Sequence, residues 1–433
     1  MSTSADPYDL RTLPAVVDAD GHADAATRAW MQADAQGFHG ARMSEAAMDR
    51  WAASMVADGH RLTAVHRNGP LPAELGQEAV TAPVATFSSF ERTIDVGGAE
   101  PLAAHLISSV TVRPTHRRRG LLRRMMTADL ERAAAQGYPL AALTVSEATI
   151  YRRFGFGVAT STHSVEVATG ARFELLTPPP GRCEVVDART LLEVGPAVFA
   201  RFHATHPGSV DRQSAHWAGV AGLDDGKGEP DPAVRAAVHL DEHGAVDGFV
   251  SYRFAGWETK PATIDVIDLV AADAGAYLGL WEFLGAVDLV DRVRWHAAPV
   301  EDPLRWALSD ARLVSTTRVQ DWLWLRVLDP VRAFAARGYV GEGELVLEVE
   351  DALGFAAGRF RLRVAGGRGE VERVEADPDL ALDVSALGSL HLGGVDPLAL
   401  AAAGRVRELV PGAALRARTL LAPTAPVWGI THF

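Results

Sequence analysis

Cysteine is almost absent from this chain of 433 residues. The single residue, Cys183, cannot form an internal disulfide and offers no cysteine cluster for zinc, so we expect no metal site. Apolar runs of about 20 residues, the length of a membrane-spanning helix, are also missing. The first residues lack the basic segment and apolar core of a secretory signal. These features predict a cytoplasmic protein without a membrane span.

The chain also has no excess of positive charge. The formal net charge is −13, and a nucleic-acid-binding protein needs a basic face to neutralise phosphates, so nucleic acid is not an expected partner. Hydrophobic residues make up 48% of the chain and charged residues 22%, which is typical of a globular protein. A chain of this length is too long for one core, so we expect two or three domains.

The sequence divides into three blocks where its hydrophobic pattern changes. The first block, residues 1–172, ends before a proline-rich linker at 177–181 that can continue neither a helix nor a sheet. The second block covers 173–310 and the third covers 311–433. We expect each block to form one domain.

Hydrophobic periodicity gives the first block a helical pair, a strand meander and a β-α-β-α-β segment. Helices are expected at 21–39, 44–57, 118–136 and 147–153, and strands at 61–67, 83–94, 102–112, 139–145 and 156–168. This order predicts a mixed sheet that binds its ligand at the carboxyl end of a central strand.

The later blocks carry weaker patterns. The second block repeats the order of the first, which predicts a degenerate copy of the same fold without a ligand. The third block predicts an α+β domain. Their expected helices are 188–203, 274–287, 384–390 and 396–403, and their expected strands are 234–240, 246–254, 262–270, 292–296, 344–350, 358–364 and 370–375.

Residues 107–124 hold the strongest functional signal in the chain. An apolar strand leads through a turn into a helix that opens with three arginines and a glycine, residues 117–120. Three cations at a helix N-terminus oppose the helix dipole, which favours anions there. Free N–H groups, a glycine and guanidinium groups together form a site for a pyrophosphate. A solvated basic face is the alternative, but it does not account for the glycine turn between a strand and an amphipathic helix.

Residues 107–160 resemble the core of the GNAT acetyltransferases, whose pyrophosphate turn reads Arg/Gln-x-x-Gly-x-Gly/Ala. Here the turn reads Arg-Arg-Arg-Gly-Leu-Leu from Arg117, with Leu122 in place of a small residue. The chain resembles the enhanced intracellular survival (Eis) family of actinobacterial N-acetyltransferases in three features: that departure, the segment 150–157 and the terminal Thr-His-Phe. The resemblance implies an α/β (α+β) fold with a catalytic GNAT domain, a GNAT-like domain without coenzyme and a sterol-carrier-protein-like C-terminal domain. It also implies a homo-hexamer.

The turn and the resemblance together predict acetyl-CoA as the cosubstrate. We expect the backbone of the strand before the turn to pair with the pantetheine arm and to supply an N–H group to the oxyanion, while its valines pack into the core. In family members, the two residues that follow the next strand, here Ser146 and Glu147, contact the coenzyme through their main chain. The predicted donor site consists of Val110, Val112, Arg117, Arg118, Gly120, Leu121, Ser146 and Glu147. Arg123 and Arg124 are expected as a surface pair or as contacts of the 3′-phosphate.

Tyr151 is the predicted general acid. It follows Gly120 by 31 residues, on a short helix that borders the thioester sulfur in this topology. A phenol with a pKa near 10 can give its proton to a departing thiolate, and the resemblance implies the same role. The alternative is an aromatic side chain packed beside Phe154 and Phe156.

No histidine or glutamate of the core motif has an obvious position for a general base. The resemblance implies that the C-terminal carboxylate of Phe433 takes this role. Such a group has an ordinary pKa near 3.5, and burial would make it more basic. The residues alone predict only a docked apolar tail. His432 stands where another family member has an acidic residue, so an acidic contact to the amine is not expected there.

The resemblance also implies small polycationic acceptors of the aminoglycoside type, modified at one or several amines. Aromatic rings and a carboxylate that could contact such a substrate are Asp34, Phe38, Phe87, Phe90 and Trp217, although core or surface packing is the favoured interpretation for each. Two other functions stay open. One is acetylation of protein lysines, and the other is a non-catalytic scaffold that binds acyl-CoA or lipid.

Overall fold

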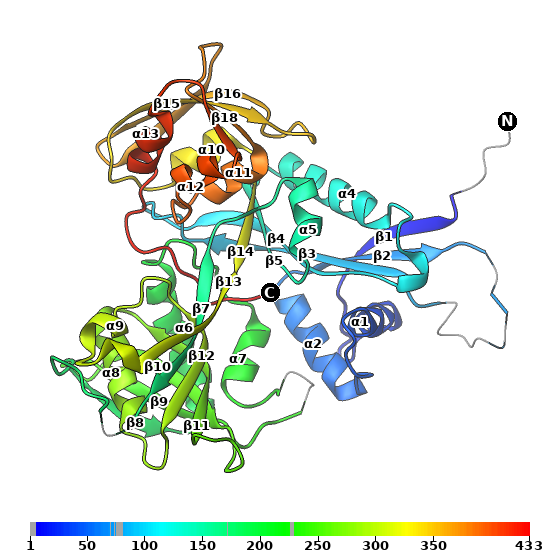
Figure 1. The fold of residues 1–433 in the computed structure, drawn as a ribbon. Helices are drawn as coiled ribbons and strands as arrows, with labels where there is room; N and C mark the ends of the chain where they lie inside the picture. Colours follow the sequence, from blue (N-terminus) through cyan, green and yellow to red (C-terminus); the bar gives the residue numbers. More distant parts are fainter. Residues whose placement is uncertain (1–5, 70, 73, 75–80, 171, 226–228) are drawn as a thin grey trace.

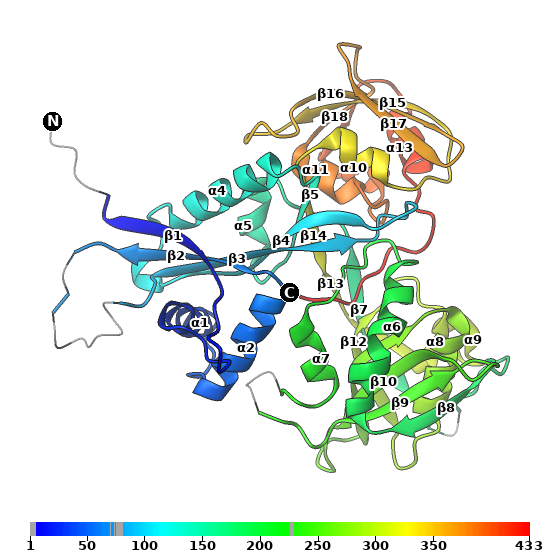
Figure 2. The same ribbon diagram turned by 180° about the vertical axis from the view of Figure 1, so that it is seen from behind.

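The protein folds into three lobes that meet around the C-terminus of the chain (Figure 1). The structure, a computed structural model, describes residues 6–69, 71–72, 74, 81–170, 172–225 and 229–433. These residues form three β-sheets with helices packed on their faces (Figures 1 and 2). The expected mixed α/β class is confirmed.

The first lobe contains a seven-stranded sheet in the order β1-β2-β3-β4-β5-β14-β6. Neighbouring strands are antiparallel, except that β4 and β5 pair in parallel. The central strands are buried on both faces. The strands are β1 (Tyr8–Pro14), β2 (Arg61–Arg67), β3 (Ala85–Ile94), β4 (Leu102–Val112), β5 (Leu140–Thr144), β6 (Gly157–Val158) and β14 (Leu323–Val327).

Helices cover both faces of this sheet. Helices α1 and α2 lie on one side, and α4 and α5 lie on the other (Figures 1 and 2). The side chain of Asp24 accepts a hydrogen bond from the first turn of α1, and Ser44 does the same for α2, which fixes where each helix begins. The bounds are α1 (Ala25–Gly37), α2 (Glu45–Ala57), α4 (Leu121–Ala135) and α5 (Ala148–Tyr151).

The second lobe is built on a sheet in the order β13-β7-β12-β11-β10-β9-β8, with β11 and β12 parallel. Its strands are β7 (Ser161–Ala168), β8 (Arg182–Val186), β9 (Arg235–Leu240), β10 (Val246–Phe254), β11 (Thr263–Ala271), β12 (Arg292–Ala298) and β13 (Val314–Asp321). Its helices are α6 (Leu191–His203), α7 (Ser214–Val220), α8 (Ala274–Gly285) and α9 (Leu304–Ala307). Helix α7 faces α2 of the first lobe (Figure 1).

The two sheets exchange strands. The prediction of a single strand over residues 156–168 is wrong, because β6 pairs in the first sheet whereas β7 pairs with β12 and β13 in the second. Later in the chain β14 returns to the first sheet and separates β5 from β6. Strand pairing therefore crosses positions 172 and 310, where we expected the domain boundaries.

The third lobe has a five-stranded sheet in the order β17-β16-β15-β18-β19. Its strands are β15 (Gly343–Glu350), β16 (Gly358–Ala365), β17 (Arg368–Arg373), β18 (Leu380–Asp383) and β19 (Val406–Glu408). Its helices are α10 (Pro330–Ala336), α11 (Val384–Leu390), α12 (Pro397–Ala402) and α13 (Ala413–Leu420). Helix α11 packs on β14, so one hydrophobic core runs from the first sheet into the third lobe through Leu106, Leu325 and Leu387.

The last residues of the chain run along the second lobe to the centre of the molecule (Figure 1). The indole N–H of Trp428 donates to the main-chain oxygen of Ala297 at 2.9 Å, and its ring packs edge-on against Phe202. The hydroxyl of Thr431 donates to the main-chain oxygen of Val210 at 2.6 Å. The tail is therefore fixed, as the sequence predicted.

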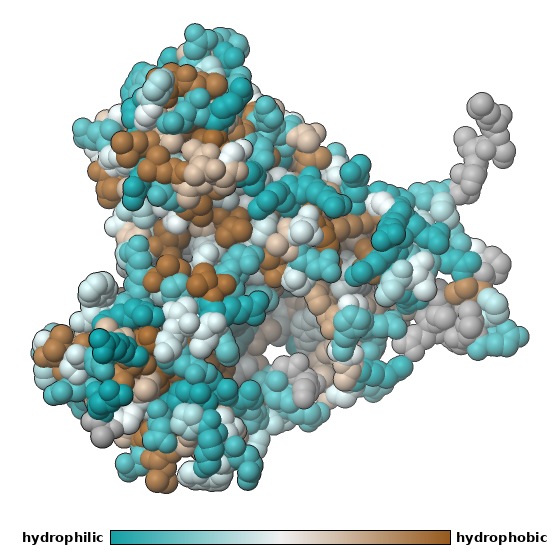
Figure 3. Space-filling view, viewed as in Figure 1, coloured by the Kyte–Doolittle hydropathy of each residue, from teal (hydrophilic) through white to brown (hydrophobic). Residues whose placement is uncertain are grey.

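The visible surface in Figure 3 is mostly hydrophilic, with hydrophobic residues in separate groups. The same view shows a hollow between the lower lobe and the first lobe. Across the part of the chain that the structure describes, every helix is too short or too polar to cross a bilayer.

We predict that the Asp351→Ala variant loses about 3 to 5 kcal/mol of unfolding free energy, the usual cost of leaving a buried charge without its partner. Both oxygens of Asp351 accept hydrogen bonds from the fully buried Arg326 guanidinium, at 2.7 Å each. Urea unfolding measures the loss. The control is Glu372→Ala, which removes an ion pair between Arg361 and a largely exposed carboxylate and should cost under about 1 kcal/mol. Equal losses in the two variants would contradict the prediction.

Candidate active site

The arginine turn connects β4 to α4. After Val112 the chain makes one turn of 3-10 helix at Pro114–His116, and Gly120 then precedes the first residue of α4. Gly120 has a φ of 77°, which an L-residue rarely adopts. A Cβ added to Gly120 would meet no atom within 4 Å, so the space before the helix is open to a ligand.

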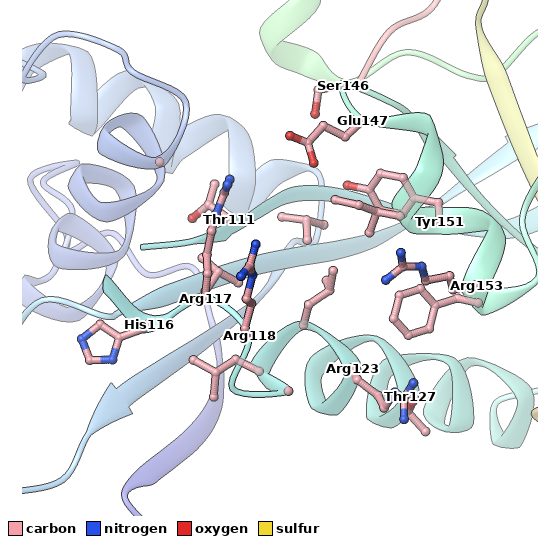
Figure 4. A pocket seen from close by; sticks show the side chains of 18 of the residues that line it. Thr111, His116, Arg117, Arg118, Arg123, Thr127, Ser146, Glu147, Tyr151 and Arg153 are labelled. Atoms are coloured by element: carbon pink, nitrogen blue, oxygen red, sulfur yellow. The ribbon is translucent and has the colours of Figure 1, made fainter. Parts of the chain in front are cut away.

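A cavity of about 860 Å³ lies beside this turn (Figure 4). The end of β4, the start of α4 and helix α5 form its walls. All eight residues predicted for the donor site line it, namely Val110, Val112, Arg117, Arg118, Gly120, Leu121, Ser146 and Glu147. Arg123 also lines the cavity, whereas Arg124 pairs with Asp6 at 2.9 Å. We call this space the donor cavity.

The backbone of β4 is free on one side where it borders the donor cavity. Its pairing with β5 ends at Ile107, which lies opposite Leu143. Beyond this point β4 pairs only with β3, through a register shift next to Ser109, whose φ is 54°. The stretch 108–112 therefore offers N–H and C=O groups to an extended ligand, as a strand edge does.

Tyr151 ends helix α5 at the wall of the donor cavity, and its hydroxyl points into the cavity (Figure 4). The residue is buried, and its ring packs edge-on against Phe156. Burial, with a smaller effect of the nearby Glu147, raises the pKa of Tyr151 to about 12. The phenol is therefore protonated at every physiological pH.

The third lobe contributes one wall of the donor cavity. Ala352 and Leu353, in the loop after β15, line it beside α5. The carboxylate of Asp351 holds this loop by accepting hydrogen bonds from two of its backbone N–H groups, and Arg326 joins the loop to the main-chain oxygen of Phe154. This wall could not be predicted from the sequence, because the loop carries no residue pattern of its own.

Phe433, the last residue, is bonded to the end of β5. The hydroxyl of Thr144 donates to the main-chain oxygen of Phe433, and the N–H of Phe433 lies 3.4 Å from the same hydroxyl oxygen. The ring of Phe433 packs edge-on against Phe90 with 5.9 Å between ring centroids. The terminal carboxylate is therefore held at the carboxyl end of a central strand.

Phe433 lines a second cavity, of about 270 Å³, between α2, α7 and the free stretch of β4. We call it the acceptor cavity. Ser108 and Ser109 line it, whereas the next three residues of β4 line the donor cavity. Its walls are Trp51, Ser54, Met55, Asp58, His60, Ser108, Ser109, Gln213, Ala215, His216, His432 and Phe433.

The structure does not bring the predicted substrate residues together. Phe38 lines the donor cavity, and Phe87 is fully buried in the core of the first lobe. Trp217 packs against Phe199 in the second lobe. Asp34 lies beneath the sheet, 3.4 Å from the hydroxyl of Thr86, and burial raises its pKa to about 7.

The residues that do line the acceptor cavity were missed, apart from Phe433 and His432. One signal for them was available in the expected helix at 44–57. Trp51 and Met55 stand four residues apart and so share a helix face. Nothing in the sequence pointed to His216, because α7 has only seven residues and was not predicted.

Three segments of the chain match known domain families. Residues 24–159 and residues 208–327 each match an acetyltransferase (GNAT) domain. Residues 330–429 match a sterol carrier protein domain.

Relatives that match over most of the chain agree with these domain matches. A Streptomyces avermitilis protein described as an uncharacterized N-acetyltransferase is 39% identical, over 80% of this chain and 84% of that protein. N-acetyltransferase Eis from Mycobacterium tuberculosis is 37% identical, over 70% of this chain and 73% of that protein. The solved structure of Eis1 from Mycobacterium abscessus has a TM-score of 0.80 at 30% identity and covers 98% of this chain and 100% of that one. A GCN5-related N-acetyltransferase from Anabaena variabilis shares the fold, with a TM-score of 0.77 at 20% identity over 98% of this chain and 100% of that one.

The fold, the arginine turn and these matches define the class: the protein is an N-acetyltransferase with two GNAT domains and a sterol-carrier-protein-like third domain. Within that class, the chain belongs to the Eis family. The resemblance read from the arginine turn and the terminal Thr-His-Phe is confirmed. The roles of the individual residues stay predictions.

We predict that replacing Arg117 and Arg118 together by alanine raises the acetyl-CoA Kd by roughly 100-fold or more, since each hydrogen bond to a charged group contributes about 1.5 to 3 kcal/mol. Isothermal titration calorimetry measures the change. Arg119→Ala is the control, because Arg119 is exposed in the same turn but does not line the donor cavity. A comparable loss in Arg119→Ala would show that overall charge, and not the cavity, determines affinity.

Proposed function

We propose that the protein transfers an acetyl group directly from acetyl-CoA to an amine of a small molecule, with Tyr151 as general acid and the Phe433 carboxylate as general base. One observation carries the proposal: the free stretch 108–112 of β4 separates two cavities. Tyr151 lies on the donor side and Phe433 on the other side. A thioester and an amine can therefore meet across this stretch without a covalent enzyme intermediate.

Different segments of the site bind the successive parts of acetyl-CoA. The arginines and Gly120 bind the pyrophosphate at the start of α4, where free N–H groups and guanidinium groups favour an anion. The pantetheine arm adds to the free side of β4 from Val112 toward Ser109. The thioester oxygen then accepts a hydrogen bond from a backbone N–H of the same stretch, which stabilises the negative charge that develops.

The Phe433 carboxylate and the Tyr151 hydroxyl each carry out one of the two proton transfers. The Phe433 carboxylate takes a proton from the attacking nitrogen as the C–N bond forms. The C–S bond then breaks, and the Tyr151 hydroxyl gives its proton to the leaving sulfur. Because burial raises the pKa of Tyr151 to about 12, the phenol is in its acidic form throughout the working pH range.

The alternatives receive less support. A lipid-carrying scaffold would need a roomy apolar cavity in the third lobe, but the apolar cavity beside Phe334, Phe360 and Leu387 measures about 10 Å³, hardly the space of one water molecule. Acetylation of protein lysines would require a side chain to enter between α2 and α7. Family membership favours polycationic acceptors such as aminoglycosides and a homo-hexamer. Light scattering of the purified protein tests the hexamer.

We predict that Tyr151→Phe lowers kcat by about 10²- to 10⁴-fold, the usual contribution of a general acid, and leaves the acetyl-CoA Kd nearly unchanged. Stopped-time assays of thiol release give kcat. Tyr138→Phe makes the same chemical change at a residue that does not line the donor cavity and hydrogen-bonds Glu91 instead, so this control should keep its activity. A Tyr151→Phe enzyme with more than a tenth of the normal kcat would contradict the assignment.

We predict that one glycine added after Phe433 lowers kcat strongly, because it moves the carboxylate by about 3.8 Å and turns the Phe433 carboxyl into an amide. Phe433→Leu is the matched control, since it changes the ring but keeps a carboxylate at the same position. Thiol release and thermal unfolding are measured for both variants. Equal activity of the two would overturn the role of the carboxylate.

A further inference from the structure

A buried carboxyl group that the proposed mechanism does not use lies behind the free stretch of β4. It belongs to Asp34 of α1, which is 6% exposed. The carboxyl lies 3.4 Å from the Thr86 hydroxyl on β3 and is hydrogen-bonded to the side chain of Ser109 on β4. Ser109 has a φ of 54°, in the left-handed region that residues other than glycine rarely adopt. Such a backbone persists only where its surroundings hold it.

The Thr86 hydroxyl is at the centre of the contacts that hold this backbone. Its oxygen lies 3.1 Å from the main-chain oxygen of Ser109, 2.6 Å from the Thr111 hydroxyl and 3.4 Å from the carboxyl of Asp34. Helix α1 packs closely on this group, because a Cβ added to Gly37 would lie 2.5 Å from the side chain of Thr111. Close packing therefore keeps these polar groups together.

The Thr86 hydroxyl has only one proton for these partners. A hydroxyl donates one hydrogen bond and accepts up to two, and the Ser109 main-chain oxygen can only accept. A protonated Asp34 donates to the Thr86 oxygen and leaves the Thr86 proton for Ser109. An ionised Asp34 can only accept, and a carboxylate attracts a donor more strongly than a neutral carbonyl does. The charge of Asp34 therefore decides whether Thr86 donates to Ser109.

The direction of the Ser109 oxygen also determines where the next N–H group points. In a trans peptide, the C=O of one residue and the N–H of the next residue point in opposite directions. The peptide between Ser109 and Val110 is trans. Because Thr86 and Asp34 hold the Ser109 oxygen toward α1, the N–H of Val110 points to the other face of the sheet, where α4, α5 and the donor cavity lie (Figures 1 and 2).

Asp34 changes its charge near neutral pH. Burial raises the pKa of Asp34 to about 7, against a smaller lowering by the hydrogen bonds of Thr86 and Ser109. The carboxyl is therefore protonated below this pH and ionised above it. The charged side chains of α1, α2, β3 and β4 pair with other groups or are exposed: Arg28 pairs with Asp49, Arg92 with Asp58, His105 with Asp129 and Glu91 with Tyr138, and Glu45 and Arg50 are exposed.

We propose that Asp34 is a positioning residue for acetyl transfer and that it acts in its protonated form. It donates to Thr86, Thr86 donates to the main-chain oxygen of Ser109, and the N–H of Val110 is thereby directed at the thioester oxygen. Ionisation of Asp34 breaks this series of hydrogen bonds. It also places a negative charge behind the position where the oxyanion develops. This inference rests on the proposed acetyl transfer and adds a pH-dependent control of its oxyanion site.

The test compares the pH profile of kcat for Asp34→Asn with that of the wild-type protein, by thiol release at saturating acetyl-CoA and saturating kanamycin or spermidine. The amide donates to Thr86 at every pH and cannot ionise. We expect equal kcat values at about pH 6 and a kcat of Asp34→Asn about tenfold above wild type at about pH 8.5, part of the roughly 10²- to 10³-fold effect of an oxyanion donor. The titrations of the amine and of the base cancel in this ratio. Parallel profiles would overturn the inference.

Asp302→Asn is the matched control. Asp302 is a buried carboxyl of the second lobe that accepts a hydrogen bond from the Tyr277 hydroxyl at 2.9 Å, and burial raises its pKa as well. Its variant should follow the wild-type profile. If Asp302→Asn also gains activity at high pH, a general effect of buried carboxyls replaces the specific role of Asp34.

Thr86 variants test the hydrogen bonds themselves. Thr86→Val keeps the shape of the side chain but removes the hydroxyl, so we expect kcat to fall about tenfold already at about pH 6, with the acetyl-CoA Kd unchanged. Thr86→Ser keeps the hydroxyl and should restore kcat. A normal kcat in Thr86→Val would contradict the proposal.

Infrared spectra measure the charge of Asp34 without turnover. The C=O band of its protonated carboxyl should be absent from Asp34→Asn and should disappear from the wild-type protein with a midpoint at about pH 7. A midpoint near the ordinary pKa of about 4 would overturn the inference and leave acetyl transfer standing. If no amine releases thiol although calorimetry shows that acetyl-CoA binds, acetyl transfer itself fails, and the inference fails with it.

Discussion

The hydrogen bonds between Thr144 and Phe433 join the last residue of the chain to the end of β5, and the proposed chemistry depends on this contact. A chain terminus normally frays, because little holds it. Here the hydrogen bonds of Trp428 and Thr431 hold the tail on the second lobe just before the last residue. Only the contact between Phe433 and the first sheet then has to be stabilised. The terminal carboxylate can then stand beside the free stretch of β4 as a positioned group.

This constraint gives each lobe a function in one site. The first lobe supplies the free edge of β4, the arginine turn and Tyr151. The second lobe supplies α7 as a wall of the acceptor cavity and carries the tail, and Asp58 sets the spacing of α2 and α7. The third lobe shares a core with the first sheet and closes one side of the donor cavity at Leu353. The GNAT-like second domain is thus a structural part of the site, although we expect it to bind no coenzyme.

The parts of the site that lie close together in the sequence could be predicted. The strand, the glycine turn and the amphipathic helix of residues 107–135 are local features, so their periodicity and the residue types at 117–120 identified residues that lie around one cavity, and their role in binding the donor stays a prediction. Tyr151 lies close by in the sequence, in the same β-α unit, and could be predicted for the same reason. The terminal role of Phe433 needed the resemblance, because no local pattern links it to Thr144.

Long-range pairing could not be predicted. The return of β14 to a position between β5 and β6 depends on partners far away in sequence, and so does the division of residues 156–168 into β6 and β7, which pair in different sheets. Aromatic side chains were also ambiguous: Phe87 and Trp51 both lie within predicted elements, but the first is core and the second lines a cavity.

The most direct measurement is a crystal structure with a bisubstrate analogue, in which coenzyme A is joined through an acetyl linker to the nitrogen of an amine. With Phe433 as base and Tyr151 as acid, we expect the nitrogen within about 2.6 to 3.2 Å of a Phe433 carboxylate oxygen, and the sulfur within hydrogen-bond reach of the Tyr151 hydroxyl. An analogue bound along β4 with its nitrogen directed away from Phe433 would contradict the role of the terminal carboxylate as the base.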